Sequence, residues 1–175
     1  MAICRTVLHL TIEQVESIKY LGVWLDLNLK FLQQAEYASA KAIKASCKVK
    51  RLIDSRSGLT PKIGITLYKS LVRPCWEFAV AAWAMMPDGG IKKLEQVQAR
   101  CLRQILGTKA HSATDAIEVI AHVTPVRLHI QQLCALEYTR IICKPSEFHL
   151  HKMLQEAALK HSDFTPLRSG ASISP

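Results

Sequence analysis

The sequence lacks the residue patterns that most catalytic sites need. No aromatic-x-Asp-Asp sequence occurs, and the aspartates stand apart from one another, at Asp26, Asp54, Asp88, Asp115 and Asp163. Metal-dependent phosphoryl transfer needs carboxylates grouped around the ions, so the chain is not expected to polymerise nucleotides by itself. A phosphate-binding GK[ST] loop and a GxSxG nucleophile motif are also absent. The sequence predicts no catalytic residue, no metal site and no cofactor.

Paired cysteines are missing as well. The cysteines form no CxxC pair and are expected to be buried small hydrophobic residues in a reducing compartment: Cys4, Cys47, Cys75, Cys101, Cys134 and Cys143. Two cysteines and two histidines cluster loosely, but the spacing of Cys134, Cys143, His149 and His151 fits no compact zinc finger, so helical packing is the preferred interpretation. The histidines are expected to be solvated, at helix ends or on polar faces: His111, His122, His129, His149, His151 and His161.

The sequence also lacks a long apolar run and an equal number of positive and negative charges. The longest apolar run, Phe78–Met86, is far shorter than the ~20 residues that span a bilayer, and the N-terminus does not resemble a signal peptide. No membrane partner is expected, and the location is predicted to be intracellular, in the cytoplasm or the nucleus. Lysine and arginine number 23 against 14 aspartates and glutamates, which gives a formal net charge of +9. This excess favours an acidic partner such as nucleic acid.

A strand-like run near the N-terminus, Ser17–Asp26 (SIKYLGVWLD), has a glycine at its centre. Its alternation predicts one strand, with Ile18, Tyr20, Gly22 and Trp24 on one face, and a hairpin with Thr6–Leu10. Gly22 has two interpretations. It either marks a simple bend or bulge, or lets another backbone, such as a nucleic-acid strand, approach closely.

From Phe31 to Arg56 the period changes to that of a helix. One stripe of this helix is apolar and small, with Ala38, Ala42, Ala45, Val49 and Leu52. A second stripe is basic, with Lys41, Lys44, Lys48 and Arg51 within about a quarter of the circumference. The basic stripe is either a track for a phosphate backbone or a solvated face that maintains solubility.

The rest of the chain predicts further helices. They start at Thr60–Pro61, near Pro74, at Asp88, at Ser112 and at Thr124–Pro125, with a last one over Glu147–Lys160. The helix from Asp88 to Gly107 offers a second basic surface, with Lys92, Lys93, Arg100, Arg103 and Lys109. The expected fold is therefore mainly α: an N-terminal β-hairpin over residues 1–30, five to six helices over 31–160, and a disordered tail over 161–175.

Four separated motifs give the chain a family resemblance. Lys19–Asp26 (KYLGVWLD), Leu67–Trp83 (LYKSLVRPCWEFAVAAW), Lys93–Gly107 (KLEQVQARCLRQILG) and Val123–Glu137 (VTPVRLHIQQLCALE) resemble, in order and spacing, the region after the palm in reverse transcriptases of non-LTR (LINE-type) retrotransposons. The resemblance covers roughly residues 3 to 140. One departure is that Gln33 and Gln34 stand where family members often carry a histidine.

The resemblance implies roles for two groups of residues. Tyr20, Leu21 and Gly22 would belong to the primer grip, which holds the 3′ end of the primer. The helices from about residue 35 would form the thumb and connection, with the stripe of Lys41, Lys44, Lys48 and Arg51 along the template–primer duplex. Further matches to a family motif are Tyr68, Arg73, Glu77, Phe78 and Trp83, whose apolar members are expected in the thumb core.

The leading functional hypothesis is a fragment of an RNA-directed DNA polymerase without fingers and palm. It would bind an RNA or DNA template–primer independently of sequence, with the missing fingers and palm as its intramolecular partner, and would not be an enzyme on its own. Two alternatives stay open. One is a helical protein-interaction module that uses exposed apolar residues such as Trp24 and Trp83. The other is a non-functional product of a truncated element.

Overall fold

The computed structural model describes residues 5–7, 10–12, 15–53 and 60–144, and the single residues 149, 152, 153 and 156. The chain divides into two compact units, Met1–Cys134 and Ala135–Pro175. The predicted domain boundaries at residues 30 and 160 stay predictions. The predicted tail over 161–175, the break at Ser57–Gly58 and Cys4 lie outside the described residues.

Two local hairpins open the first unit. Strand β1 (Arg5–Val7) pairs antiparallel with β2 (Leu10–Ile12), and β3 (Ser17–Tyr20) pairs antiparallel with β4 (Val23–Asp26). The expected pairing of Thr6–Leu10 with Ile18–Asp26 is therefore wrong. The run Ser17–Asp26 folds back on itself, because Leu21 and Gly22 both have positive φ, 45° and 89°, as a two-residue type I′ hairpin turn requires.

The turn also changes which side chains share a face. Lys19 lies opposite Trp24, and Ile18 lies opposite Leu25, and opposed residues of an antiparallel pair point to the same side. The expectation that Ile18 and Trp24 share a face is therefore wrong, because a two-residue turn exchanges the faces that an unbroken strand would keep. Lys19 and Trp24 become neighbours instead.

The helices agree with the predicted fold class, which is confirmed: mainly α after an N-terminal hairpin. They are α1 (Leu32–Ile53), α2 (Pro61–Leu67), the π-helix η1 (Tyr68–Val72), α3 (Pro74–Glu77), α4 (Val80–Trp83), α5 (Asp88–Leu106), α6 (Thr114–Ile120) and α7 (Val126–Ile142). The four described residues between 149 and 156 are helical, within the predicted last helix. In the described residues no helix is long and apolar enough to cross a membrane.

Pro74 acts as its sequence position predicts, since a new helix, α3, starts there. The preceding turn widens to a π-helix, in which the N–H of Arg73 bonds the carbonyl of Tyr68 at 3.0 Å. Ala79 then takes a left-handed conformation, with φ 52°, and separates α3 from α4. The segment is therefore bent twice rather than one buried helix.

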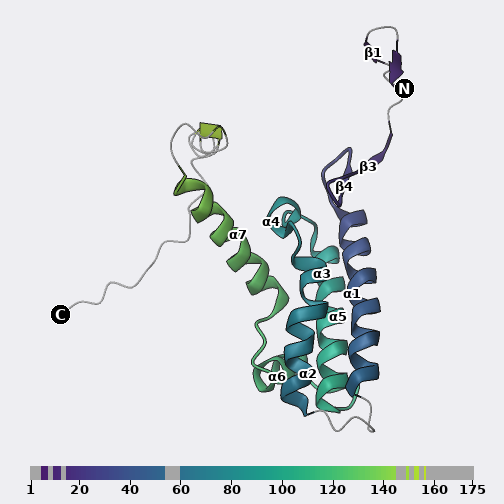
Figure 1. Ribbon diagram of the computed structural model, residues 1–175, viewed down its shortest axis with the longest axis vertical. Helices are drawn as coiled ribbons and strands as arrows, with labels where there is room; N and C mark the ends of the chain where they lie inside the picture. The colour runs from purple at the N-terminus through teal and green to yellow at the C-terminus, as the bar shows by residue number, and fades with distance from the viewer. Residues whose placement is uncertain are drawn as a thin grey trace, which may run out of the picture. The chain divides into compact units, whose positions relative to one another are not determined.

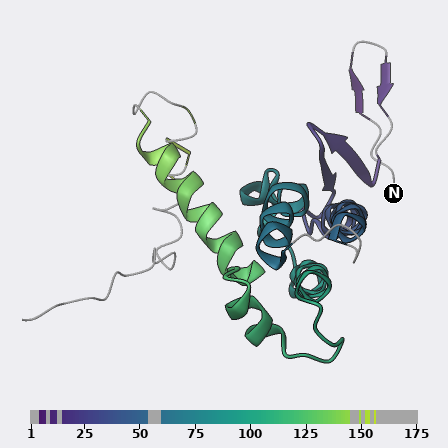
Figure 2. The same ribbon diagram turned by 60° about the horizontal axis from the view of Figure 1, so that its bottom comes forward.

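Helices α1 and α5 and the bent segment α2–η1–α3 pack side by side in the first unit (Figures 1 and 2). Small residues allow this close approach: Ala35, Ala38 and Ala42 of α1 are buried. A Cβ on Gly90 would lie 3.1 Å from Ala35 Cβ, whereas one on Gly64 would lie 2.9 Å from Ile53 Cδ1 and 2.7 Å from Ile105 Cγ2. Because α1 and α5 meet at their starts and again at their ends, they run in the same direction.

The core is filled by large side chains from the bent segment, α4 and α5, with Tyr68, Trp76, Trp83, Leu94 and Leu102 all fully buried. Trp83 is buried, as the family motif predicts, and is not exposed as the interaction-module alternative requires. Its indole N–H donates to the carbonyl of Phe78 at 3.0 Å. Of the predicted apolar stripe on α1, Ala38, Ala42 and Val49 are buried, but Leu52 is 47% exposed near the end of the helix. Phe78, expected in the core, is 56% exposed.

Candidate nucleic-acid interface

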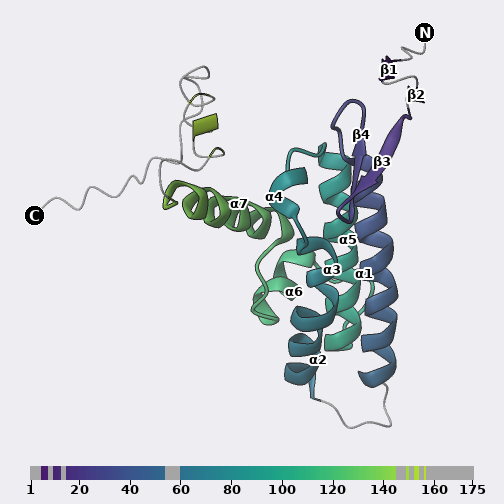
Figure 3. The ribbon, with the colours of Figure 1, turned by 45° about the horizontal axis from the view of Figure 1, so that its top comes forward.

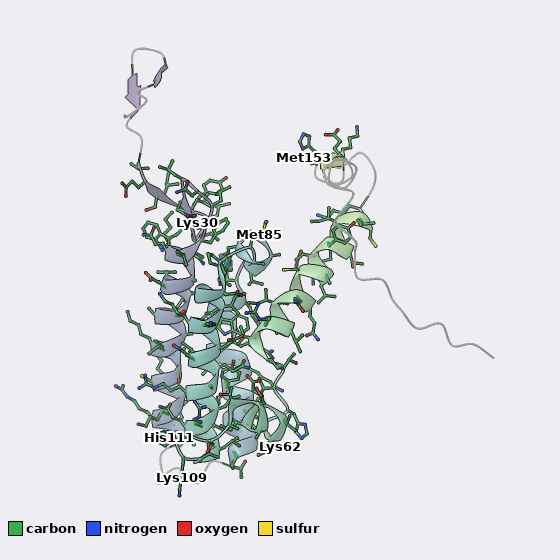
Figure 4. The ribbon with its side chains drawn as sticks, turned by 180° about the vertical axis from the view of Figure 1, so that it is seen from behind. Lys30, Lys62, Met85, Lys109, His111 and Met153 are labelled. Carbon is green, nitrogen blue, oxygen red and sulfur yellow. The ribbon has the colours of Figure 1, made fainter. Side chains whose placement is uncertain are left out.

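The four predicted cations Lys41, Lys44, Lys48 and Arg51 are all exposed on α1. We call them the basic stripe. They lie on the side away from the buried alanines, and nitrogen-tipped side chains project from the outer side of α1 (Figure 4). The only acid of α1 is Glu36, and it is engaged by Lys93 of α5, with Nζ 2.5 Å from Oε1. Within the described residues, no ion pair joins the basic stripe to a carboxylate.

The predicted primer-grip residues lie at the tip of the β3–β4 hairpin, next to the first turns of α1 (Figure 3). Tyr20 ends β3 and is 61% exposed, and Leu21 is 78% exposed in the turn. A Cβ on Gly22 would lie 3.2 Å from Cε1 of Phe78. The positive φ at position 22 and the closeness of the Phe78 ring therefore explain why a glycine stands there. A contact of Tyr20, Leu21 and Gly22 with a primer stays a prediction.

Polar contacts fix the hairpin to α1. The N–H of Trp24 donates to Oε1 of Gln34 at 3.0 Å, and Gln34 is buried. The carboxylate of Asp26 accepts from the N–H of Phe31 at 2.8 Å and from that of Lys30 at 3.0 Å. These bonds, the one from Phe31 first, lower the pKa of Asp26. Gln34, which stands where family members often carry a histidine, therefore holds the hairpin in place.

Sequence reasoning missed two residues that meet where the hairpin contacts α1, Lys19 of β3 and Tyr37 of α1. Lys19 Nζ donates to the hydroxyl of Tyr37 at 3.2 Å and lies 4.5 Å from the centre of the Tyr37 ring. The pKa of Tyr37 is lowered, mainly by this hydrogen bond and then by the charges of Lys19, Lys41 and Lys44. Tyr37 precedes Lys41 by four residues, so helical spacing alone could have found it. Lys19 is brought there only by the hairpin.

The second predicted basic surface is partly used for structure. Lys92, Arg100 and Lys109 are exposed, but Lys93 pairs with Glu36, as described above. Arg103 is half-buried, and its Nη2 donates to the carbonyl of Ser112 at 2.9 Å and to the hydroxyl of Thr114 at 3.0 Å. Arg103 therefore holds the loop before α6. The basic stripe of α1 therefore has more exposed cations outside ion pairs than this second surface, within the described residues.

An open hollow of about 520 Å³ lies beside α5 and α6. It is lined by both signs of charge: Lys92, Glu95, Gln96, Ala99, Arg103, Thr114, Asp115, Glu118 and Pro125. Glu118 accepts from Nε2 of Gln98 at 2.8 Å, and burial raises its pKa. Because carboxylates lie among the cations, this hollow does not favour the binding of a polyanion. Among the residues that the structure describes, no group of three or more His, Cys, Asp or Glu side chains is arranged to hold a metal ion.

Two sequence expectations about reactive side chains need correction. His129 is not solvated: it is mostly buried, its Nε2 lies 2.6 Å from Oε1 of Glu77, and its ring meets Trp76 edge-on at 5.8 Å. The cysteines are not uniformly buried, since Cys47 and Cys143 are exposed. Cys101 is buried, and desolvation raises the pKa of its thiol. His151 and His161 lie outside the described residues.

The chain is similar to known proteins of one kind. No family model matches the chain, and no solved structure matches it significantly. Its homologues are RNA-directed DNA polymerases of non-LTR retrotransposons, which confirms the resemblance found in the sequence.

Three relatives illustrate the similarity. The probable RNA-directed DNA polymerase from transposon X-element of Drosophila melanogaster is 30% identical over 96 residues, which cover 55% of this chain and 11% of the relative. The RNA-directed DNA polymerase from mobile element jockey of the same species is 24% identical over 148 residues, 85% of this chain and 16% of the relative. The jockey polymerase of Drosophila funebris is 25% identical over 128 residues, which cover 73% of this chain and 14% of the relative. The chain thus spans less than a fifth of the length of these relatives.

Proposed function

We propose that this chain is the primer-grip and thumb part of a reverse transcriptase and binds the backbone of a template–primer duplex without regard to sequence. Support comes from the names of its relatives, all RNA-directed DNA polymerases of mobile elements. The site residues in this proposal are Tyr20, Leu21 and Gly22 on the hairpin and the basic stripe on α1.

The basic stripe is the observation that carries the proposal. Its four cations extend over about 15 Å of helix axis, at 1.5 Å per residue from Lys41 to Arg51. This length matches about four base-pair steps of a duplex, in which successive phosphates of one strand are about 3.4 Å apart along the axis. Four like charges on one face repel each other, and a line of phosphates removes that repulsion. Each neutralised phosphate also releases counterions, which drives binding at low salt.

The test is the salt dependence of binding by the purified full chain to a labelled DNA duplex and to an RNA–DNA hybrid of the same length. Four phosphate contacts predict a slope of about −3.6 in log affinity against log salt, which is about a hundredfold loss from 50 to 200 mM. Changing Lys41, Lys44, Lys48 and Arg51 together to glutamate should abolish that binding. Binding that ignores salt, or no binding by the unchanged chain, would contradict the proposal.

A matched control separates the stripe from net charge. Four exposed lysines outside it, Lys30, Lys62, Lys92 and Lys109, can be changed to glutamate with the same total change in charge. Figure 4 labels three of them, with Lys30 at one end of the first unit and Lys62 and Lys109 at the other. This variant should keep most of the affinity. An equal loss in both variants would mean that only the overall charge attracts nucleic acid.

We further propose that the chain does not polymerise nucleotides by itself and that the fingers and palm of a longer protein would complete it. Two of its aspartates already have structural roles. Asp26 accepts two backbone N–H groups, and Asp88 pairs with Arg127, with Nη2 2.9 Å from Oδ1. A primer-extension assay with the purified chain should give no product, and extension above background would refute this part.

A protein-interaction module is the second candidate, and an exposed apolar end of the first unit favours it. Leu21 is 78% exposed, Phe78 56% and Met85 90%. Large exposed apolar side chains that gather in one region often mark a contact with another protein or domain. A pull-down after nuclease treatment tests it. A defined protein partner that is lost when Leu21, Phe78 and Met85 are changed to serine would favour this function.

A further inference from the structure

Lys19, Tyr37 and Trp24 form a cluster in which the two rings fix the position of the lysine side chain. The Lys19 ammonium lies 4.5 Å from the centre of the Tyr37 ring and 5.8 Å from that of Trp24, so two aromatic rings hold the charge in place. Its cross-strand neighbour is Trp24. Lys19 Nζ also donates to the Tyr37 hydroxyl at 3.2 Å. A flexible lysine is thus given a defined position on the surface between β3 and α1.

Hydrogen-bond donors remain at this cluster. An ammonium has three N–H donors and no acceptor, and one of them is used on Tyr37. The Tyr37 oxygen accepts that bond, so its own hydrogen is left to donate. Both residues stay accessible, Tyr37 with 39% of its surface exposed. The cluster therefore presents donors from two elements to one solvent-facing position.

Charge around the cluster favours an anion there. Lys41 and Lys44 follow Tyr37 by one and two helical turns and contribute to the lowered pKa of its hydroxyl, behind the hydrogen bond from Lys19. Two of the acids near the cluster along the chain are already engaged: Asp26 by the N–H groups of Lys30 and Phe31, and Glu36 by Lys93. A third, Glu16, precedes Lys19 by three residues, is exposed and forms no ion pair within the described residues. A tyrosine with a lowered pKa is also a stronger donor to an anionic oxygen.

We propose that Lys19 and Tyr37 bind one phosphodiester oxygen of a nucleic-acid strand, with the ammonium neutralising the charge and the phenol donating a hydrogen bond. The site continues the basic stripe from α1 onto the β3–β4 hairpin, so that one strand is contacted along both elements. The inference rests on the proposed function. A free phosphate ion has the same chemistry, but this open site offers few donors and should hold it only weakly outside a polymer.

The experiment measures the affinity of the full chain for a 16-base-pair DNA duplex over a salt series. Lys19→Gln removes one charge contact, so the salt slope should become shallower by about 0.9. Tyr37→Phe removes a neutral donor, so the affinity should fall about two- to tenfold at an unchanged slope. Lys62→Gln, on an exposed part of α2, and Tyr138→Phe, on α7, are the matched controls and should change neither quantity.

The outcomes separate the inference from the function on which it rests. No binding by the unchanged chain overturns both. Binding that the four-glutamate variant of the basic stripe loses, but that Lys19→Gln and Tyr37→Phe keep with unaltered slope and affinity, overturns the inference alone. Inorganic phosphate at millimolar concentration should not compete with the duplex, and competition would assign the site to the free ion.

A further variant and a second measurement distinguish a lost contact from a loss of binding caused by misfolding. Lys19→Arg keeps the charge and should restore the slope. In a chain with ¹³C-labelled tyrosine, the ring Cζ signal that Tyr37→Phe removes should shift when the duplex is added. A signal that stays in place while the duplex binds would refute the contact, whatever the variants do.

Discussion

The hydroxyl of Tyr68 lies 2.6 Å from Oε1 of Gln98, and both side chains are fully buried. Nε2 of the same amide donates to Glu118 at 2.8 Å and to the carbonyl of Thr124 at 3.2 Å. Gln98 of α5 thus links three other parts of the chain: η1, α6 and the segment before α7. Burial raises the pKa of Tyr68, so the phenol stays protonated and donates.

Tyr68→Phe should destabilise the chain by about 1 to 2 kcal/mol, because the buried oxygen of Gln98 then loses its donor. Gln98→Leu should cost more, since it leaves both Tyr68 and Glu118 without their partner. Urea unfolding followed by circular dichroism measures both. Tyr138→Phe, at a partly exposed ring, is the control and should have little effect; an equal loss there would rule out the network as the cause.

Glu118 should make stability fall as pH rises. Burial raises its pKa in the folded chain, so between the unfolded value of about 4.3 and the folded value the folded state binds more protons than the unfolded state. The contribution is therefore present at low pH and is lost as pH passes through this window. Glu118→Gln should remove the part of the decline that lies above the unfolded pKa of the carboxyl. The control Glu16→Gln, at an exposed side chain, should follow the unchanged chain.

Gly22→Ala should destabilise the β3–β4 hairpin by about 1 to 2 kcal/mol, because an L-residue is strained at φ 89°. The added Cβ would also come 3.2 Å from the Phe78 ring. Gly89 is the matched control: it lies in the first turn of α5, and a Cβ added there would meet nothing within 4 Å, so Gly89→Ala should be neutral or slightly stabilising. Thermal melts compare the two, and equal effects would count against a special role for the turn.

The first unit should unfold cooperatively, because its helices share one core with Trp76, Trp83 and Leu94 at the centre. Scanning calorimetry of the purified chain should therefore show a heat-absorption peak whose calorimetric and van 't Hoff enthalpies agree for that transition. This result would argue against the hypothesis of a non-functional product of a truncated element. A broad transition without a peak, or aggregation on purification, would support that hypothesis instead.

Some features were predictable from the sequence because they depend on local spacing. The burial of Ala38, Ala42 and Val49 and the exposure of the basic stripe follow from one helical period. The start of a helix at Pro74 follows from the missing N–H of proline. Such features need no knowledge of what packs against them.

Other features depend on partners far away in the chain. The position of His129 is set by Glu77, fifty-two residues earlier, and that of Lys19 by Tyr37, eighteen residues later. The Leu21–Gly22 turn was missed because its first residue is a leucine at positive φ, whereas Asn-Gly or Asp-Gly is the usual signal. Without that turn, the face of Trp24 relative to Ile18 was assigned wrongly too.

The placement of the tryptophans supplies the chain with two separate optical reporters. Trp76 and Trp83 are buried, so their emission should follow the integrity of the fold. Trp24 is only partly buried and lies beneath the Lys19 ammonium, so its emission should respond to whatever binds there. Comparison of the unchanged chain with the variant Trp24→Phe would separate the two signals, so that fluorescence alone reports on occupancy and on unfolding, without a label on either molecule.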